Sequence, residues 1–422
     1  MSAENLESQK TRTCVPAGEE SATLIGMRIW ITLCLAALLL AALAPAEPNK
    51  PVNWEGLPDP FHTESATNRP NVIDRPSDAK LMVPEGFKIE EYITGDFKRP
   101  RFMILGPNDE LIFSDSGSRN VADGAVYVHR GGTTQKLIEN LDRPYGLAFH
   151  EIWLYVAEPT SVKRYVYDPD GMKVGKGEEI ISYEGHGKGH WTRSLLFEGH
   201  SKMYVTVGSG SNISLGEDPV RAALHRYNAD GSGHETFATG LRNIIGLRFY
   251  PGSSEIWAAV QERDGLGDDL ANDFLVNVKK GEFYGWPYAY NGPHPEPRHD
   301  GAGADMVAKT LYPDVLLGAH VAVLDIHFYT GTQFPEKYRG GLFMAFHGSW
   351  NRSVRTGYSV TFIPFEDGRP QSGPQDFMTG WMLGEDKSEV WGRPVGLLQL
   401  KDGSMLVSDD GGRKIWRISY GE

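Results

Sequence analysis

Apolar and polar positions along the chain repeat in one recognisable phrase. Each copy is a short apolar strand, a turn of Gly, Pro, Asn or Asp, and a second apolar or alternating strand. The clearest copies are RPRFMILGPNDELIFSD (residues 99–115) and RPVGLLQLKDGSMLVSD (residues 393–409), which share length and pattern. Short strands joined by turns of this kind predict antiparallel β-structure.

Further copies of the phrase occupy the middle of the chain: residues 143–158, 190–207, 242–262 and, in a degenerate form, 326–348. Additional strand-like segments follow several copies, at residues 125–129, 163–167, 224–227, 359–364 and 415–418. We therefore expect an all-β fold, a six-bladed β-propeller of four-stranded antiparallel blades. The alternative is a β-sandwich, in which the similarity between the phrases would be a coincidence.

Polar residues recur just before the first strand of each phrase. When the phrases are aligned, one position holds Arg99, Arg143, Asn243 and Arg393, and the preceding position holds His190 and Arg242. A propeller brings equivalent positions of its blades to the central axis. Converging arginines would suit a ligand with several carboxylates or phosphates, because each guanidinium can form a bidentate bond. The alternative is that each Arg pairs with an acid of the next blade.

An acidic, glycine-rich segment, QERDGLGDDLANDF (residues 261–274), follows the second strand of one phrase. Asp264, Asp268, Asp269 and Asp273 offer oxygen atoms of the type that calcium prefers. The spacing is not that of an EF-hand, and a solvated turn is the alternative interpretation.

The first 79 residues differ from the rest. Residues 27–46 contain an Arg, then an apolar run, and then small residues of the kind found at a signal-peptidase cleavage site. This order predicts a secretory signal peptide. An uncleaved membrane anchor is the alternative. Residues 1–26 form a polar extension, and we expect translation to start at Met27. Residues 47–79 are interpreted as an extended lead-in to a propeller domain spanning residues 80–422, exported to the periplasm or anchored facing it.

Charge and cysteine content narrow the function. The net charge of −13 argues against nucleic-acid binding, which needs a basic face. Both cysteines, Cys14 and Cys34, lie ahead of the expected mature chain. The mature chain would therefore have no disulfide, no cysteine nucleophile and no cysteine zinc site.

Several motifs together resemble one family. RNIIGL (242–247), GLGDD (265–269) and KKGEFYGWP (279–287), with His190 five residues before Leu195, are similar to the soluble PQQ-dependent glucose, sorbosone and pyranose dehydrogenases. YTGTQFP (329–335) and FHGSWNR (346–352) look more like the sorbosone branch than the glucose branch.

The resemblance implies pyrroloquinoline quinone (PQQ) on the propeller axis, a calcium ion, and oxidation of a sugar or sugar aldehyde by hydride transfer to the quinone, with an external electron acceptor. It implies His190 as the general base. The implied cofactor contacts are Arg242, Asn243 and Arg393, with His347 or Arg352 in place of a family lysine; Arg143, close to the position of an absent family glutamine, is a further candidate. The implied metal ligands are the backbone carbonyls of Asp264 and Gly265, and the acidic segment adds Asp268 as a candidate.

One departure leaves a question open. The family places an Asp before its histidine, whereas this chain has Gly189, so the residue that orients His190 is not evident. Two other functions remain as alternatives, a calcium-dependent lactonase and a non-catalytic exported propeller that binds a glycan or a protein.

Overall fold

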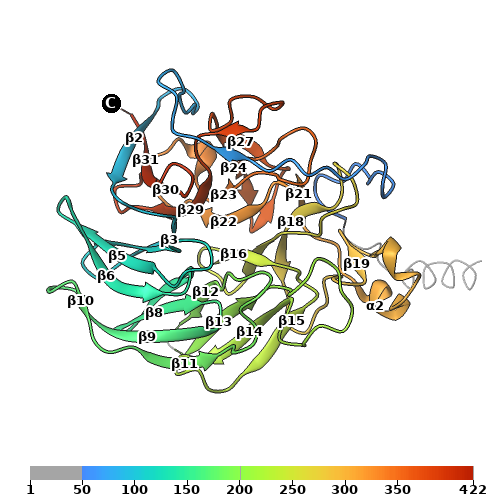
Figure 1. Cartoon of the computed structure of the whole chain (residues 1–422), viewed down its shortest axis with the longest axis horizontal. Coiled ribbons are helices and arrows are strands. Elements are labelled where there is room, and N and C mark those ends of the chain that lie inside the picture. Colours follow the sequence, from blue (N-terminus) through green and yellow to red (C-terminus); the bar gives the residue numbers. More distant parts are fainter. Residues whose placement is uncertain (1–49, 200, 422) are drawn as a thin grey trace, which may run out of the picture. The chain divides into compact units, whose positions relative to one another are not determined.

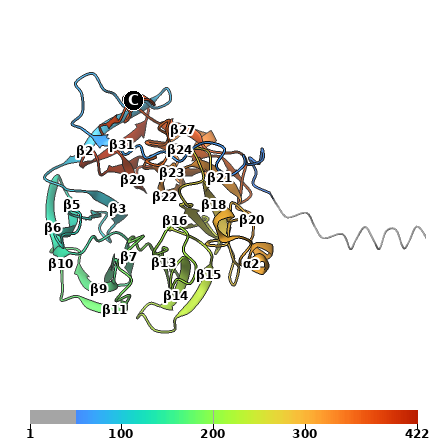
Figure 2. The same cartoon turned by 45° about the vertical axis from the view of Figure 1, so that its right-hand side comes forward.

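The computed structural model describes residues 50–199 and 201–421, so the predictions for residues 1–46 lie outside the described residues. The remaining chain forms six antiparallel sheets that follow one another around a ring, which the colour gradient traces in Figures 1 and 2. The six-bladed propeller prediction is confirmed.

The first three blades each begin with their innermost strand. Blade 1 contains β3 (Pro100–Leu105), β4 (Leu111–Asp115), β5 (Gly124–Arg130) and β6 (Thr133–Leu141). Blade 2 contains β7 (Leu147–His150), β8 (Trp153–Glu158), β9 (Ser161–Asp168), β10 (Lys173–Val174) and β11 (Glu178–Ser182). Blade 3 contains β12 (Leu195–Glu198), β13 (Lys202–Val207), β14 (Ala223–Asn228) and β15 (Glu235–Thr239).

The last three blades include the degenerate copy and a strand from the start of the domain. Blade 4 contains β16 (Ile244–Phe249), β17 (Ile256–Val260), β18 (Asn272–Val278) and β21 (Val315–Ala319). Blade 5 contains β22 (Val323–Phe328), β23 (Leu342–Phe346), β24 (Ser359–Ile363) and β27 (Gln375–Met378). Blade 6 contains β29 (Pro394–Gln399), β30 (Met405–Asp409), β31 (Lys414–Tyr420) and β2 (Phe87–Thr94).

Strand β2 closes the ring. It pairs antiparallel with β31 from Phe87 opposite Tyr420 to Thr94 opposite Lys414, so the two ends of the domain complete one sheet (Figure 1). A closed ring leaves only short, protected sheet edges.

Short elements lie outside the six blades. Three two-stranded sheets are formed by β1 (Asn71–Val72) with β28 (Glu389–Val390), β19 (Ala289–Tyr290) with β20 (His294–Pro295), and β25 (Phe365–Glu366) with β26 (Arg369–Pro370). The described helices are the 3-10 helices η1 (Pro297–His299) and η2 (Glu336–Tyr338) and the α-helix α2 (Ala304–Lys309). Among the described residues, no helix has the length and apolar character needed to cross a bilayer.

The repeated phrase has a physical reason where neighbouring blades meet. The fourth residue of the phrase is often Gly, and its backbone lies against the next blade. A Cβ on Gly146 would lie 2.4 Å from the Arg193 carbonyl, and one on Gly396 would lie 2.4 Å from the Arg101 carbonyl. Glycine is therefore needed at these positions because the two backbones approach too closely for a side chain.

The closing Ser-Asp of the phrase is also explained. Ser408 Oγ accepts a hydrogen bond from the Gly396 N–H (2.8 Å) and donates to the Arg101 carbonyl in blade 1 (2.5 Å). Asp409 accepts the Arg393 N–H at 2.7 Å, as Asp115 accepts the Arg99 N–H at 2.8 Å in blade 1. The serine joins two blades, and the aspartate fixes the start of its own first strand.

The lead-in crosses the face that carries the loop at residues 261–274. The Phe61 N–H donates to the Leu266 carbonyl (2.7 Å), and Thr63 Oγ1 accepts the Asp268 N–H (2.7 Å). Asn68 accepts a hydrogen bond from Arg355 (2.7 Å). The lead-in is thus mostly exposed, as its composition suggests, yet it is bonded along its length to the propeller.

The Ser408 link provides a test of how the blades are held. We expect Ser408→Ala to lower the free energy of unfolding by about 1–3 kcal/mol, because it leaves buried backbone groups of two blades without a partner. The measurement is urea unfolding of the purified domain. Ser419→Ala, on strand β31 of the same blade, is the control and should change stability by less than about 0.5 kcal/mol. Equal stabilities of the two variants would contradict this role.

Candidate functional site

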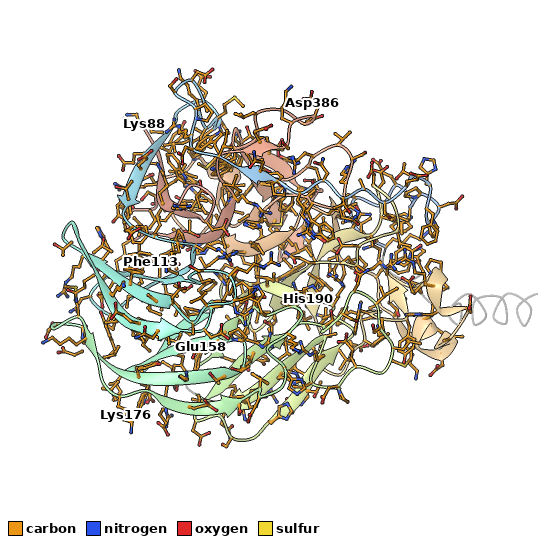
Figure 3. All side chains as sticks on the ribbon, in the orientation of Figure 1. Lys88, Phe113, Glu158, Lys176, His190 and Asp386 are labelled. Atoms are coloured by element: carbon orange, nitrogen blue, oxygen red, sulfur yellow. The ribbon has the colours of Figure 1, made fainter. Side chains whose placement is uncertain are left out.

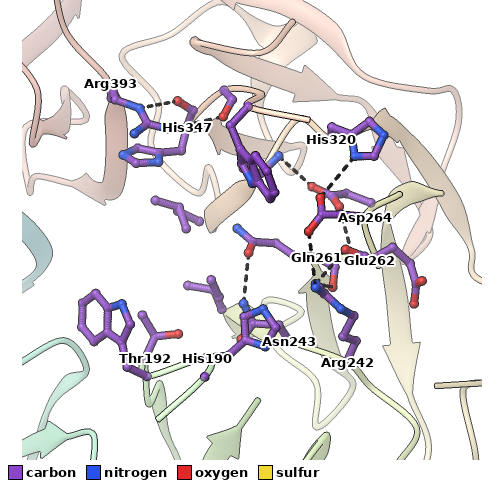
Figure 4. A pocket seen from close by; sticks show the side chains of 18 of the residues that line it. His190, Thr192, Arg242, Asn243, Gln261, Glu262, Asp264, His320, His347 and Arg393 are labelled. Atoms are coloured by element: carbon purple, nitrogen blue, oxygen red, sulfur yellow. Dashed lines mark hydrogen bonds and ion pairs between the residues drawn. The ribbon is translucent and has the colours of Figure 1, made fainter. Parts of the chain in front are cut away.

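A cavity of about 430 Å³ lies where the first strands of the blades converge. Its lining includes His190, Arg242, Asn243, His347 and Arg393, five of the residues singled out in the sequence (Figure 4). His190 lies near the middle of the molecule in Figure 3. Equivalent positions of different blades do therefore meet at one place.

His190 is held in one tautomer. Its Nδ1 lies 2.9 Å from the carbonyl oxygen and 2.9 Å from the hydroxyl oxygen of Ser209. The Ser209 hydroxyl already donates to the Ser211 carbonyl (2.6 Å), so both Ser209 oxygens act as acceptors and Nδ1 carries the proton. The lone pair is then on Nε2, which has no hydrogen-bond partner among residues 50–199 and 201–421.

His190 is uncharged at neutral pH. Burial lowers its pKa to about 3, and the positive charge of Arg242 acts in the same direction. An imidazole with a free lone pair and no charge can accept a proton from a hydroxyl group.

Two glycines shape the approach to His190. A Cβ on Gly189 would lie 2.5 Å from the Gly210 carbonyl oxygen, so an Asp does not fit at this position in the present backbone. A Cβ on Gly208 would lie 2.6 Å from the His190 Cβ and 2.4 Å from Asn243 Oδ1. Ser209 takes the orienting role that the sequence left unassigned.

Arg242 is buried and fully engaged. It donates to the Asn212 carbonyl (3.2 Å), to the Asn212 side chain (2.9 Å) and to the Glu262 carbonyl (2.7 Å). A weaker bond reaches the Gln261 carbonyl (3.4 Å), and the Asp264 carboxylate lies 3.6 Å away. Arg242 thus contributes positive charge to the cavity and ties its wall together, with its N–H groups directed to the protein.

The opposite wall is cationic and is organised by one buried aspartate. Asp410 lies 2.9 Å from the Arg101 guanidinium and 2.9 Å from His347 Nε2. Arg393 donates to the carbonyl oxygens of His347 (3.1 Å) and Gly348 (3.3 Å). Burial lowers the pKa of His347 to about 4, so this imidazole is neutral and donates from Nε2 to the carboxylate.

The third wall is acidic. His320 Nε2 donates to the Gly267 carbonyl (2.9 Å), and its Nδ1 lies 3.5 Å from Asp264 (Figure 4). Burial opposes both charges, but their attraction holds the pKa of His320 above and that of Asp264 below its ordinary value. Burial raises the pKa of Glu262 to about 7 and that of Asp273 to about 6.

Several predicted residues lie elsewhere. Arg143 lines a neighbouring cavity and pairs with Asp142 (2.8 Å). Arg352 pairs with Asp269 (2.9 Å), outside the cavity lining. The structure therefore does not bring either arginine to the central cavity.

The predicted calcium ligands accept hydrogen bonds from other residues of the protein. The carbonyl oxygen of Asp264 accepts a hydrogen bond from Asn212 (2.8 Å), and that of Gly265 accepts one from Arg298 (2.8 Å). Asp268 binds the backbone N–H and hydroxyl group of Ser353 instead. Among the described residues, no group of three or more acidic or histidine side chains is arranged to hold a metal ion.

The TrAA12-like family profile matches residues 81–279 and 294–421. The chain belongs to the TrAA12-like family. This confirms the resemblance to the quinoprotein sugar dehydrogenases that the sequence motifs indicated. An uncharacterized protein of Borreliella burgdorferi is 32% identical over 357 residues, which cover 81% of this chain and 91% of the relative. The PQQ-dependent pyranose dehydrogenase of Coprinopsis cinerea is 30% identical over 127 residues, 26% of this chain and 17% of that protein.

Solved structures share the fold of this TrAA12-like chain. The holo form of the Coprinopsis cinerea pyranose dehydrogenase PQQ domain has a TM-score of 0.68 and 20% identity, covering 84% of this chain and 100% of that one. The calcium structure of a Trichoderma reesei carbohydrate-active enzyme of family AA12 has the same score and identity, covering 83% and 99%. The apo soluble aldose sugar dehydrogenase of Escherichia coli has a TM-score of 0.61 and 16% identity, covering 79% and 99%.

Other lining residues of the TrAA12-like site escaped the sequence analysis. They are Arg101, Trp191, Gln261, Glu262 and His320. Arg101 carried a signal, because it lies two residues after Arg99 in the repeated phrase. Trp191 occupies the aligned position of the arginines but has no charge. His320 lies in a loop with no repeat, where its backbone φ is 63°.

The low pKa of His190 predicts a pH effect on stability. Between pH 6.5 and about 4 the unfolded chain binds a proton here and the folded chain does not. Folded stability therefore falls as pH falls, by at most about 1.4 kcal/mol per pH unit from this residue. We expect His190→Gln to lose less stability than the wild type between pH 7 and pH 5, as measured by urea unfolding. His62→Gln, at an exposed histidine, is the control, and parallel pH profiles for all three proteins would contradict the assignment.

Proposed function

We propose that this TrAA12-like protein is a PQQ-dependent dehydrogenase that oxidises a sugar or a sugar aldehyde and passes the electrons to an external acceptor. The observation that carries the proposal is His190, a neutral imidazole fixed by Ser209 with its lone pair at a cavity that has a cationic wall. The names of the relatives, pyranose dehydrogenase and aldose sugar dehydrogenase, support the same reaction class.

The residues present fit PQQ, a planar quinone with three carboxylates. Arg101 Nε and Asn243 Oδ1 are buried at the cavity without a hydrogen-bond partner among the described residues. Such orphaned atoms are costly unless a ligand or water satisfies them. Arg101 and Arg393 would hold carboxylates through charge-assisted bonds, with Asp410 and the carbonyls of residues 347 and 348 fixing their directions.

The chain's own residues divide the work of the oxidation. His190 Nε2 accepts the hydroxyl proton of the substrate as the carbon–oxygen double bond forms, and Ser209 keeps the ring in place through Nδ1. Bound PQQ supplies a two-electron acceptor for the hydride that leaves the substrate carbon. Arg101, Arg242 and Arg393 surround the cavity with positive charge, which stabilises negative charge developing there.

The predicted calcium ligands are already engaged within the protein. Asn212, Arg298 and Ser353 already donate hydrogen bonds to the oxygens of Asp264, Gly265 and Asp268, so a calcium ion bound there would share or displace these donors. We assign no ligand and no step to the metal. Export or membrane anchoring through residues 27–46 remains part of the proposal and depends on that segment alone.

The cofactor proposal is tested by calorimetric titration of PQQ into the purified protein, once with calcium and once with a chelator. We expect one PQQ per chain, because the cavity offers one cationic wall. A calcium effect of tenfold or more on Kd would show that the metal joins the complex. Absence of PQQ binding under both conditions would rule out the proposed oxidoreductase function.

The base assignment is tested by His190→Ala. We expect PQQ to bind within about threefold of the wild type, while kcat for sugar oxidation with an artificial acceptor dye falls by roughly 10²–10⁴, the usual contribution of a general base. His186→Ala, on the same loop but outside the cavity lining, is the control. Normal turnover of the His190 variant would show that another group removes the proton.

A further inference from the structure

A second cavity of about 610 Å³ adjoins the central one. Its lining includes five cationic side chains, Arg99, Arg101, Arg119, Arg143 and Lys188, and contains no acidic residue. The chain as a whole carries a net charge of −13, so this concentration of positive charge runs against the overall balance. A cavity of this size and charge is suited to a small anion-bearing ligand.

Three of the five cations have no partner of their own. Arg101 is paired with Asp410, and Arg143 is paired with Asp142. For the side chains of Arg99, Arg119 and Lys188, no hydrogen bond or ion pair is formed within residues 50–199 and 201–421.

The unpartnered charges also disfavour one another. Arg99 is half-buried, and burial together with the nearby charges of Arg101 and Arg119 lowers its pKa, while the charges of Asp410 and Asp115 offset only part of this effect. Like charges held together in a partly buried site repel, and a bound anion relieves the repulsion. The uncompensated positive charge of this cluster therefore favours the binding of an anion.

The two cavities share part of their walls. Arg101, Arg119, Gly189 and Trp191 line both of them. The Trp191 ring lies at the boundary, with the Arg101 and Arg143 guanidinium groups 5.7 and 5.6 Å from its centre. His190 follows Gly189 directly, so a ligand anchored by its charge in the second cavity would lie beside the wall that carries the base.

We propose that the second cavity binds an anionic group of the substrate, which makes the substrate a sugar that carries a carboxylate or a phosphate. This inference rests on the proposed function, because it identifies the substrate class of the same site. Guanidinium groups bind carboxylates and phosphates alike through paired N–H donors. The lining of the cavity therefore indicates an anionic oxygen group of either kind.

The test compares D-glucose, D-glucuronate and D-glucose 6-phosphate as substrates of the PQQ-loaded full-length protein with an acceptor dye. We expect kcat/KM for at least one of the two anionic sugars to exceed that for glucose by tenfold or more. Which anionic sugar is preferred distinguishes a carboxylate from a phosphate. Raising the salt concentration should reduce the preference, because screening weakens charge attraction.

Variants that remove a positive charge from the second cavity test whether the preference for anionic sugars arises there. Arg99→Gln and Lys188→Gln should each reduce the anionic-to-neutral ratio of kcat/KM by about fivefold or more. Arg369→Gln and Lys176→Gln remove the same charges from exposed positions outside the lining and serve as matched controls. Lys188 is exposed, so its variant keeps the test valid if replacement of the half-buried Arg99 impairs folding.

The outcomes separate this inference from the proposed function. Oxidation of glucose without any anionic preference, or a preference that the control variants lower equally, would overturn the inference and leave the dehydrogenase in place. A loss of PQQ affinity in Arg99→Gln and Lys188→Gln would assign the cavity to the cofactor's carboxylates and would also overturn it. Failure to bind PQQ at all would instead overturn the proposed function on which it rests.

Discussion

The close approach of neighbouring blades at the axis is the constraint on which the rest of the structure depends. Backbones pass so near to one another there that Gly146 and Gly396 have no room for a Cβ. Ser408 and Ser114 occupy equivalent positions on second strands, and their hydroxyl groups donate to the next blade, to the carbonyl oxygens of Arg101 and Tyr145 respectively.

The same constraint positions the site. Residues just ahead of each first strand are carried to the axis, so every blade contributes at least one residue to the cavity or its neighbour. Asp409 and Asp115 fix the backbone at these positions by accepting N–H bonds from Arg393 and Arg99. The arginine side chains then project from a fixed backbone, which is the preorganisation that charge-based binding requires.

Repetition decided what could be predicted from the sequence. The fold and the placement of His190, Asn243 and Arg393 followed from aligned phrases, since each copy obeys the same packing rule. Ser209, which orients His190, could not be found in this way because it lies 19 residues away on a different loop. Arg352 and Asp268 lie in loops without a repeat, where neighbours such as Asp269 and Ser353 determine their contacts.

Closure of the ring by β2 has a consequence for biosynthesis. Glu91 on β2 pairs with Lys414 on β31, across 323 positions of the chain. At about 5–20 residues per second, β2 leaves the ribosome roughly 20–60 s before its partner strand. During that interval β31, the strand with which β2 pairs, is absent, whatever the order in which the other five blades form. Synthesis of β31 therefore allows an open, edge-exposed array of blades to close into a ring.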